Sequence, residues 1–238
     1  MNRSFYIILT LLILFWDQIV HAQKSKTENL PKFDNKIIHF GFSLGINSGD
    51  FDLKPATNFH LLDSIHIVET ARNPGFNLGI ICDLHLHKYF NLRFVPALSF
   101  VQRNINYTYS PNVIISKGIE STFLDFPLHL KYRSARLNNF ATYIIGGAKY
   151  SFDLASQAKV ENMPEAPPTD IILKLKKSDY SIDIGFGFDF FLEYFKLSPE
   201  LRVSFGVPNV LIQDKTMFSN PINALNSRML LISLNFEG

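Results

Sequence analysis

Large apolar residues alternate with small or acidic ones along 178–191, and this pattern predicts a β-strand. The apolar positions are Tyr180, Ile182, Ile184, Phe186, Phe188 and Phe190, and those between them are Ser181, Asp183, Gly185, Gly187 and Asp189. Successive side chains of a strand point to opposite faces, so this strand has one apolar face and one small, acidic face. A soluble sandwich buries the apolar face, whereas an outer-membrane barrel turns it towards lipid. The stretch alone fits both arrangements.

The same alternation predicts seven more strands. The eight expected strands are 38–47, 76–87, 92–103, 123–133, 140–154, 178–191, 197–205 and 229–236. Pro96 lies inside the third strand and removes a ladder donor, which predicts a bulge or irregular pairing there. The fifth strand keeps two interpretations: either Tyr143 and Ile145 point inward on a regular strand, or Gly146 and Gly147 shift its register through a bulge.

The connections between these strands alternate strictly between long and short. The long ones are 48–73, 107–118, 155–177 and 206–226, and the short turns lie near 87–91, 134–139 and 193–195. Outer-membrane barrels combine an even number of strands with short periplasmic turns and long external loops, and a soluble sandwich has no reason to sort its connections in this way. We therefore predict an all-β fold, an eight-stranded antiparallel up-and-down transmembrane barrel of the outer membrane.

The face opposite the apolar one carries charges of both signs. Its charged and titratable residues are Asp83, His85, Arg93, Arg103, Asp125, His129, Lys131, Asp183, Asp189, Glu200 and Arg202. An eight-stranded barrel has room inside only for side chains, so opposite charges are expected to pair there. The glycines on the same face, Gly41, Gly45, Gly185 and Gly187, are expected to leave volume for neighbouring Arg and Lys side chains.

Aromatic residues gather where the predicted strands end, as in the two interfacial girdles of membrane barrels. At the short-turn end they are Tyr89, Phe90, Tyr132, Tyr194, Phe195 and Phe236. At the other end they are Tyr107, Tyr109, Tyr150 and Tyr180.

The first 22 residues have the pattern of a cleaved signal peptide. Arg3 supplies the positive charge, an apolar run extends from Phe5 to Trp16, and Val20-His21-Ala22 forms a small-residue cleavage site. The predicted domains are then the signal peptide, 1–22, a periplasmic N-terminal lead, 23–36, and the barrel, 37–238. The lead is polar and is expected to be mobile. This organisation predicts export and location in the bacterial outer membrane.

Composition narrows the class of protein further. The formal net charge is only +2, from 23 Lys and Arg against 21 Asp and Glu, which argues against a nucleic-acid partner. The single cysteine, Cys82, has no partner for an internal disulfide and lies far from the cleavage site. After the signal no apolar run reaches the roughly 18 residues of a membrane helix, so a membrane form must be a closed barrel.

Two sets of residues have the types needed for chemistry. Asp83, His85 and His87 alternate on one strand face, a spacing that suits metal ligands, although a polar lining near the rim is the preferred interpretation. The candidates for a hydrolytic site are Ser99, Asp125 and His129. No nucleophile elbow accompanies them, and such trios arise by chance. We expect no catalytic, cofactor-binding or metal site.

Five stretches carry a family resemblance: 29–36 (NLPKFDNK), 39–47 (HFGFSLGIN), 91–100 (NLRFVPALSF), 126–133 (FPLHLKYR) and 146–151 (GGAKYS). They resemble the PorT (SprT) family of outer-membrane β-barrel proteins. The resemblance covers nearly all of the mature chain, and it implies an outer-membrane component of the type IX secretion system, which in some relatives also supports gliding motility. It carries no catalytic motif.

The expected function is that of a non-enzymatic accessory or assembly component of this secretion machinery, since a packed eight-stranded lumen cannot pass a folded substrate. The expected partners are outer-membrane lipid and other membrane or periplasmic proteins of the secretion system. The alternatives are a surface adhesin or host-interaction barrel that acts through its long loops, and a lipid-modifying barrel enzyme.

Overall fold

The computed structural model of the chain describes residues 28–57, 65–109, 113–158, 160, 162, 167, 170–214 and 216–238. The predicted signal peptide, 1–22, and the start of the lead lie outside the described residues. No helix in the described part of the chain is long and apolar enough to cross a membrane.

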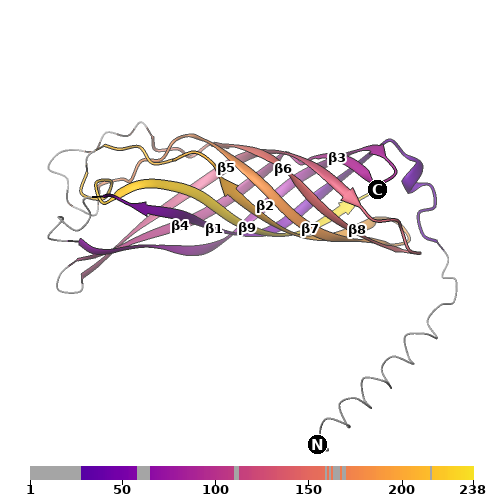
Figure 1. Cartoon of the computed structure of the whole chain (residues 1–238), viewed down its shortest axis with the longest axis horizontal. Helices are drawn as coiled ribbons and strands as arrows, with labels where there is room; N and C mark the ends of the chain where they lie inside the picture. Colours follow the sequence, from indigo (N-terminus) through magenta and orange to yellow (C-terminus); the bar gives the residue numbers. More distant parts are fainter. Residues whose placement is uncertain are drawn as a thin grey trace, which may run out of the picture.

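In the described residues, nine antiparallel strands close into a barrel (Figure 1). They are β1 (Ile38–Pro55), β2 (Ile65–His87), β3 (Phe90–Phe94), β4 (Ala97–Tyr109), β5 (Val113–Arg133), β6 (Phe140–Asp153), β7 (Ser178–Phe191), β8 (Lys196–Gly206) and β9 (Ile222–Glu237). β3 and β4 both lie between β2 and β5 and are separated at Pro96, so they are two parts of one barrel strand. The predicted irregularity at Pro96 and the ring of eight strands are confirmed, and the pairing of β1 with β2 and with β9 closes the ring.

The facing of the strands also follows the prediction. Along β7 every residue from Tyr180 to Phe190 with a large apolar side chain is exposed, whereas Asp183 and Asp189 are completely buried inside. β6 pairs with β5 and with β7 without a shift of register. Tyr143 and Ile145 therefore point inward on a regular strand, and Gly146–Gly147 makes no bulge.

The described part of the lead, 28–36, folds across the short-turn end of the barrel, where the C-terminus also lies (Figure 1). Its short 3-10 helix, η1 (Phe33–Asn35), buries Phe33. The Phe33 ring stacks on His39 at 3.8 Å and meets Phe191 edge-on at 5.7 Å between centroids. The expectation of a mobile lead is wrong for these residues, because Phe33 is buried against His39 and Phe191 at the end of the lumen.

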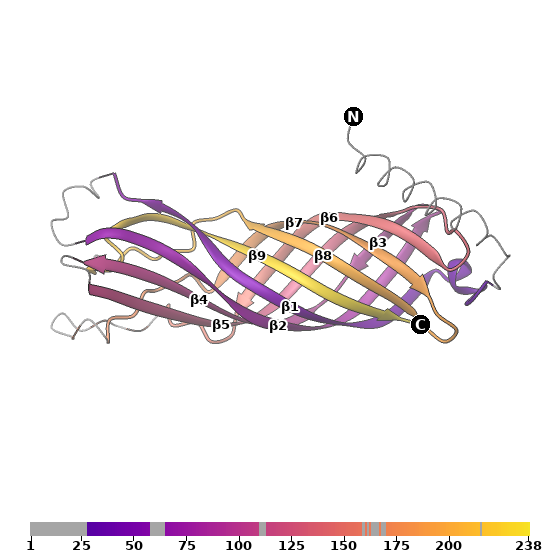
Figure 2. The same ribbon diagram turned by 90° about the horizontal axis from the view of Figure 1, so that it is seen from below.

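Two of the four long connections are largely strand, contrary to prediction. β1 continues to Pro55 and β2 begins at Ile65, so most of 48–73 is paired, and β4 and β5 likewise extend through most of 107–118. Figure 2 shows β1, β2, β4 and β5 running on beyond the other strands at this end. The connections 154–177 and 207–221 remain long, and 88–89, 134–139 and 192–195 are short turns.

Candidate functional site

A network of buried charges fills the lumen near the short-turn end. Arg93, on β3, lies 2.9 Å from Asp83, 3.2 Å from Glu200 and 2.7 Å from Glu237. Lys196 donates to the other oxygen of Glu237 at 2.9 Å. These contacts join four strands through side chains that are almost fully shielded from solvent. Since a buried charge needs an opposite partner, the alternation along each strand has placed the two signs to neutralise one another.

Tyr143 lies at the centre of this network. Its hydroxyl donates to Glu200 at 2.9 Å, and its ring centroid lies 3.7 Å from Lys131 Nζ. A Cβ at Gly187 would overlap the Tyr143 ring, and one at Gly185 would crowd Ile145. These glycines were expected to leave volume for Arg and Lys, but the space they leave is taken by the inward side chains of β6.

The three residues considered for hydrolysis are not assembled into a triad. Ser99 donates to Asp125, which also accepts from Ser151 at 2.6 Å. His129 instead lies 2.9 Å from Asp183 through Nε2, and its buried Nδ1 has no hydrogen-bond partner among the described residues. The Ser99–Asp125 pair therefore belongs to one part of the lumen lining and His129 to another.

The three residues considered for metal binding, Asp83, His85 and His87, have different surroundings and do not converge on one point. Asp83 is occupied by Arg93 and by Asn91, whose amide donates at 2.6 Å. His85 Nδ1 lies 3.0 Å from the Asn91 side-chain oxygen, while His87 is exposed at the start of the turn. No group of three or more possible metal ligands occurs in the described part of the chain.

The lumen is closed by these contacts. Two cavities of about 20 Å³ each remain among the inward side chains, lined by residues such as Arg103, Lys149 and Arg202. A cavity needs roughly 10–15 Å³ to hold one water molecule, so each of these has room for about one. The described barrel therefore has no passage for a peptide.

The polarity of the strands inverts towards the long-loop end. Along β1, apolar Ile46 points outward and polar Asn47 points inward. Four residues farther on, this is reversed: polar Asp50 points outward and apolar Phe51 points inward. Asp50 forms an exposed ion pair with Arg72 at 2.8 Å. Apolar residues inside and polar residues outside are the arrangement of a protein in water. In the segment at the long-loop end, the strands thus have the polarity of a water-soluble protein, whereas the rest of the barrel has the polarity of a membrane protein.

We call this segment the head. It consists of 47–55 of β1, 65–75 of β2, 101–109 of β4, 113–122 of β5 and 222–228 of β9, together with the described residues of 154–177 and 207–221. Its apolar core contains Phe51, Ile65, Ile105, Tyr107, Leu173, Val210, Leu211, Phe218, Ile222 and Leu225. This core closes the long-loop end of the lumen.

Tyr107 shows why the head was missed. The sequence placed it in an interfacial girdle, but it is completely buried and its hydroxyl donates to the Phe218 carbonyl at 2.8 Å. Tyr109 also packs against the core of the head. Outward aromatic contacts do occur between Tyr150 and Tyr180, at 5.0 Å between centroids, and at the short-turn end between Phe195 and Phe236, at 5.8 Å.

The two long connections are bonded to each other over the core. Lys176 N donates to Val210 O at 2.8 Å, and Ile212 N donates to Lys174 O at 3.0 Å. Asp214 accepts from Asn162 at 2.8 Å and from Thr216 at 3.0 Å. Burial raises the pKa of Asp214, but hydrogen bonds from Ser219, Thr216 and Asn162 outweigh it and hold this pKa below its usual value.

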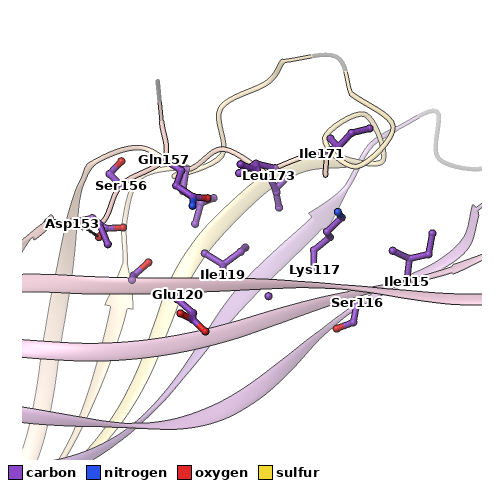
Figure 3. Close-up of a pocket in the computed structure, with 15 residues that line it drawn as sticks. Ile115, Ser116, Lys117, Ile119, Glu120, Asp153, Ser156, Gln157, Ile171 and Leu173 are labelled. Carbon is purple, nitrogen blue, oxygen red and sulfur yellow. Dashed lines mark hydrogen bonds between the residues drawn. The ribbon is translucent and has the colours of Figure 1, made fainter. Parts of the chain in front are cut away.

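A hollow of about 430 Å³ opens in the head between β5 and the connection 154–177 (Figure 3). Ile119 and Lys117 of β5 lie on one side of it, and Ser156, Gln157 and Leu173 lie on the other. Its size is within the range of about 300–1,000 Å³ that is usual for ligand-binding sites. This hollow is one candidate site on the described surface of the head; another, of about 640 Å³, lies between β1 and β2 and is lined by residues such as Leu53 and Val68.

A family model described as outer membrane protein beta-barrel domain matches residues 21–211. Among solved structures, OprG from Pseudomonas aeruginosa is 14% identical over 84% of this chain and 92% of that chain, with a TM-score of 0.47. Neisserial surface protein A is 8% identical over 82% and 95%, with a TM-score of 0.43. Ail, the attachment invasion locus protein of Yersinia pestis, is 12% identical over 85% and 100%, with a TM-score of 0.37. None of the curated proteins matches the chain. With TM-scores below 0.5, these structural likenesses support no inference about function.

Proposed function

The chain belongs to the outer membrane protein beta-barrel domain family. From its closed lumen and its resemblance to the PorT (SprT) family, we propose that it is a non-enzymatic accessory or assembly component of the type IX protein secretion machinery. In this proposal the barrel binds and positions other components of the machinery in the outer membrane. It does not conduct the exported protein.

The closed lumen is the observation that carries this proposal. Arg93, Lys131 and Lys196 and their carboxylate partners are buried across the barrel, and Phe33 packs beneath them. Opening a path would expose these pairs or separate them, and breaking a buried pair costs about 3–5 kcal/mol. A barrel of this kind has only its outer wall and its two ends available to partners.

The specific machinery is proposed from the resemblance to the PorT (SprT) family. The resembling stretches contribute to the closed parts of the barrel: 29–36 contains Phe33, 91–100 contains Arg93, and 126–133 contains Lys131. The proposal orients the short turns and the lead towards the periplasm and the head towards the outside, in keeping with membrane barrels in general.

Deletion of the gene tests the proposal. Export of cargo proteins with a C-terminal secretion signal is measured in the deletion strain, in the same strain carrying the wild-type gene, and in wild-type cells. We expect export to be lost on deletion and restored by the wild-type gene. Unaltered export in the deletion strain would refute the secretion role.

The head and its hollow favour one second candidate, a surface adhesin or host-interaction barrel. A strain that exports its cargo normally but loses adherence on deletion would support this alternative. Substitution of Ser99 and His129 with no change in outer-membrane lipid composition would argue against the lipid-modifying enzyme.

A further inference from the structure

The edge of β5 that faces away from β4 has no partner strand along 113–122 among the described residues. β5 pairs with β4 from Val113 to Asp125, but its pairing with β6 begins only at Phe123. β6 ends at Asp153, where the chain leaves the barrel wall. On the β6 side of 113–122, the hydrogen bond found among the described residues is that from Leu154 N to Thr122 O, at 2.8 Å.

The direction of the free backbone groups follows from this bond. Along a strand, the N–H and C=O groups of successive residues point alternately to the two sides. Since Thr122 O points towards β6, so do the backbone groups of Ile114, Ser116, Gly118 and Glu120. The same parity holds just past the end of β5, where Ser134 N donates to Thr142 O of β6. All four residues are exposed.

Two of the usual protections against pairing, proline and a bulge, are missing from this edge. Exposed edges are normally blunted by these, by charged side chains or by a covering loop. The β4–β5 pairing is regular throughout 113–122, and this stretch contains no proline. Its one lysine, Lys117, points into the head, with Nζ 4.5 Å from the Phe218 ring centroid.

The corresponding edge of β9 in the head is treated differently. Beyond Arg228, where the pairing of β9 with β8 ends, the chain covers β9 with its own connection 207–221. Val210 N donates to Leu225 O at 2.9 Å, and Leu225 N donates to the Asn209 side chain at 3.0 Å. The connection 207–221 therefore covers the edge of β9, whereas the edge of β5 faces the 430 Å³ hollow.

We propose that 114–120 of β5 binds an extended segment of a partner polypeptide as an added β-strand, seated between β5 and residues 155–157 and 171–175. The backbone of Ser116, Gly118 and Glu120 supplies hydrogen bonds that do not depend on the partner's sequence. Ile115, Ile119 and Leu173 offer apolar contacts on the inner side of the hollow, and Ser156 and Gln157 lie at its polar side (Figure 3). The segment that fits has apolar side chains at every second position and polar side chains between them. This inference is independent of the secretion role.

Amide hydrogen exchange tests the open edge directly. The full-length protein is placed in lipid nanodiscs, and exchange is followed for single residues by NMR. We expect fast exchange at Ser116, Gly118 and Glu120 and slow exchange at Ile115 and Ile119, whose N–H groups face β4. Slow exchange at all five amides would overturn the proposal. Slow exchange that does not depend on protein concentration would mean that the chain's own connection covers the edge. Slow exchange that depends on concentration would mean that a second copy of the chain covers it.

Peptide selection tests the occupant. Nine-residue peptides are selected on the nanodisc-embedded protein after removal of those that bind empty nanodiscs. Gly118→Pro removes one edge N–H that is not used in the β4 ladder, and should weaken binding by about tenfold or more. Gly118→Ala is the matched control, because it keeps the N–H and its Cβ meets only Asn104 at 3.4 Å.

The peptide backbone supplies the second readout, which uses the wild-type protein. Every second N–H of a bound peptide would point towards β5 and the others away from it. N-methylation of the first set should abolish binding, and N-methylation of the second set should leave it unchanged. Failure to enrich any peptide, equal binding to Gly118→Pro and Gly118→Ala, or equal effects of N-methylation on both sets would each overturn the proposal.

Discussion

Replacing Lys131 by Met should destabilise the barrel strongly, because it leaves a carboxylate buried without its cation. Lys131, on β5, and Asp189, on β7, are both fully shielded, and Nζ lies 3.0 and 3.1 Å from the two carboxylate oxygens. Ser198 Oγ donates to Asp189 at 2.6 Å and would be one of the remaining partners of the carboxylate.

The size of the effect follows from this geometry. At 3.0 Å and an effective dielectric constant of about 20, the attraction between the two charges is about 5 kcal/mol. Loss of one partner from a buried pair costs about 3–5 kcal/mol, whereas replacement of both by apolar residues is often neutral or stabilising. We therefore expect Lys131→Met to cost about 3–5 kcal/mol and Lys131→Met with Asp189→Leu to lie within about 2 kcal/mol of the wild type.

The assay is urea-dependent folding into lipid vesicles, followed by far-UV circular dichroism and by the mobility of unheated samples in SDS gels. Trp16, the one tryptophan, lies in the predicted signal peptide, so tryptophan fluorescence does not report on the mature chain. Lys88→Met, at an exposed turn residue, is the control and should change stability by less than about 1 kcal/mol. If Lys131→Met is as stable as this control, or if the double variant is less stable than Lys131→Met, the reasoning is refuted.

Three further predictions use other parts of the molecule. Gly187→Ala should cost about 1–3 kcal/mol because its Cβ overlaps a buried ring, whereas Gly146→Ala, with open space around it, should not destabilise; equal stabilities in the same vesicle assay would contradict this. The depressed pKa of Asp214 contributes stability above its ordinary value of 3.8, and this contribution is lost as the pH falls through the lower folded-state value. Asp214→Asn should therefore speed amide exchange in the loops of the head at neutral pH, with a difference from the wild type that shrinks below about pH 3.8; a difference independent of pH would count against it. Protease added to intact cells should cut within 155–177 and not at 134–139, and the reverse would invert the proposed orientation.

The lower barrel could be predicted from the sequence because one rule governs it. Every strand there has an apolar outward face and a polar inward face, so Asp183 and Asp189 were assigned to the lumen from alternation alone. Their individual partners were not predictable. Lys131 meets Asp189 across β6, and that choice depends on strand order, register and the space that Gly187 leaves for Tyr143.

The head was not predicted because apolar and polar residues continue to alternate there, but the apolar residues now point inward instead of outward. The sequence admitted two arrangements, an apolar face turned to lipid or an apolar face turned to a core, and the strands use both in succession. The predicted connection 48–73 includes Asp50 and Asp52, yet Phe51 between them lies on β1 and points inward. The signal was the change of face at Asn47–Phe51, where apolar residues move from even to odd positions.

The lead was missed for a different reason. Within 28–36 only Phe33 and Leu30 are strongly apolar, too few to predict a packed segment. Their burial depends on Phe191 and Ala141, which are more than 100 positions away and are brought together only when the barrel closes.

The closed lumen is the central claim, and electrical conductance tests it most directly. The purified protein is inserted into planar lipid bilayers, and folding is checked by its mobility in unheated SDS gels. The buried pairs around Arg93 and the apolar core of the head predict a bilayer without stepwise conductance. Stable conductance steps from the folded protein would show an open pore and contradict the account.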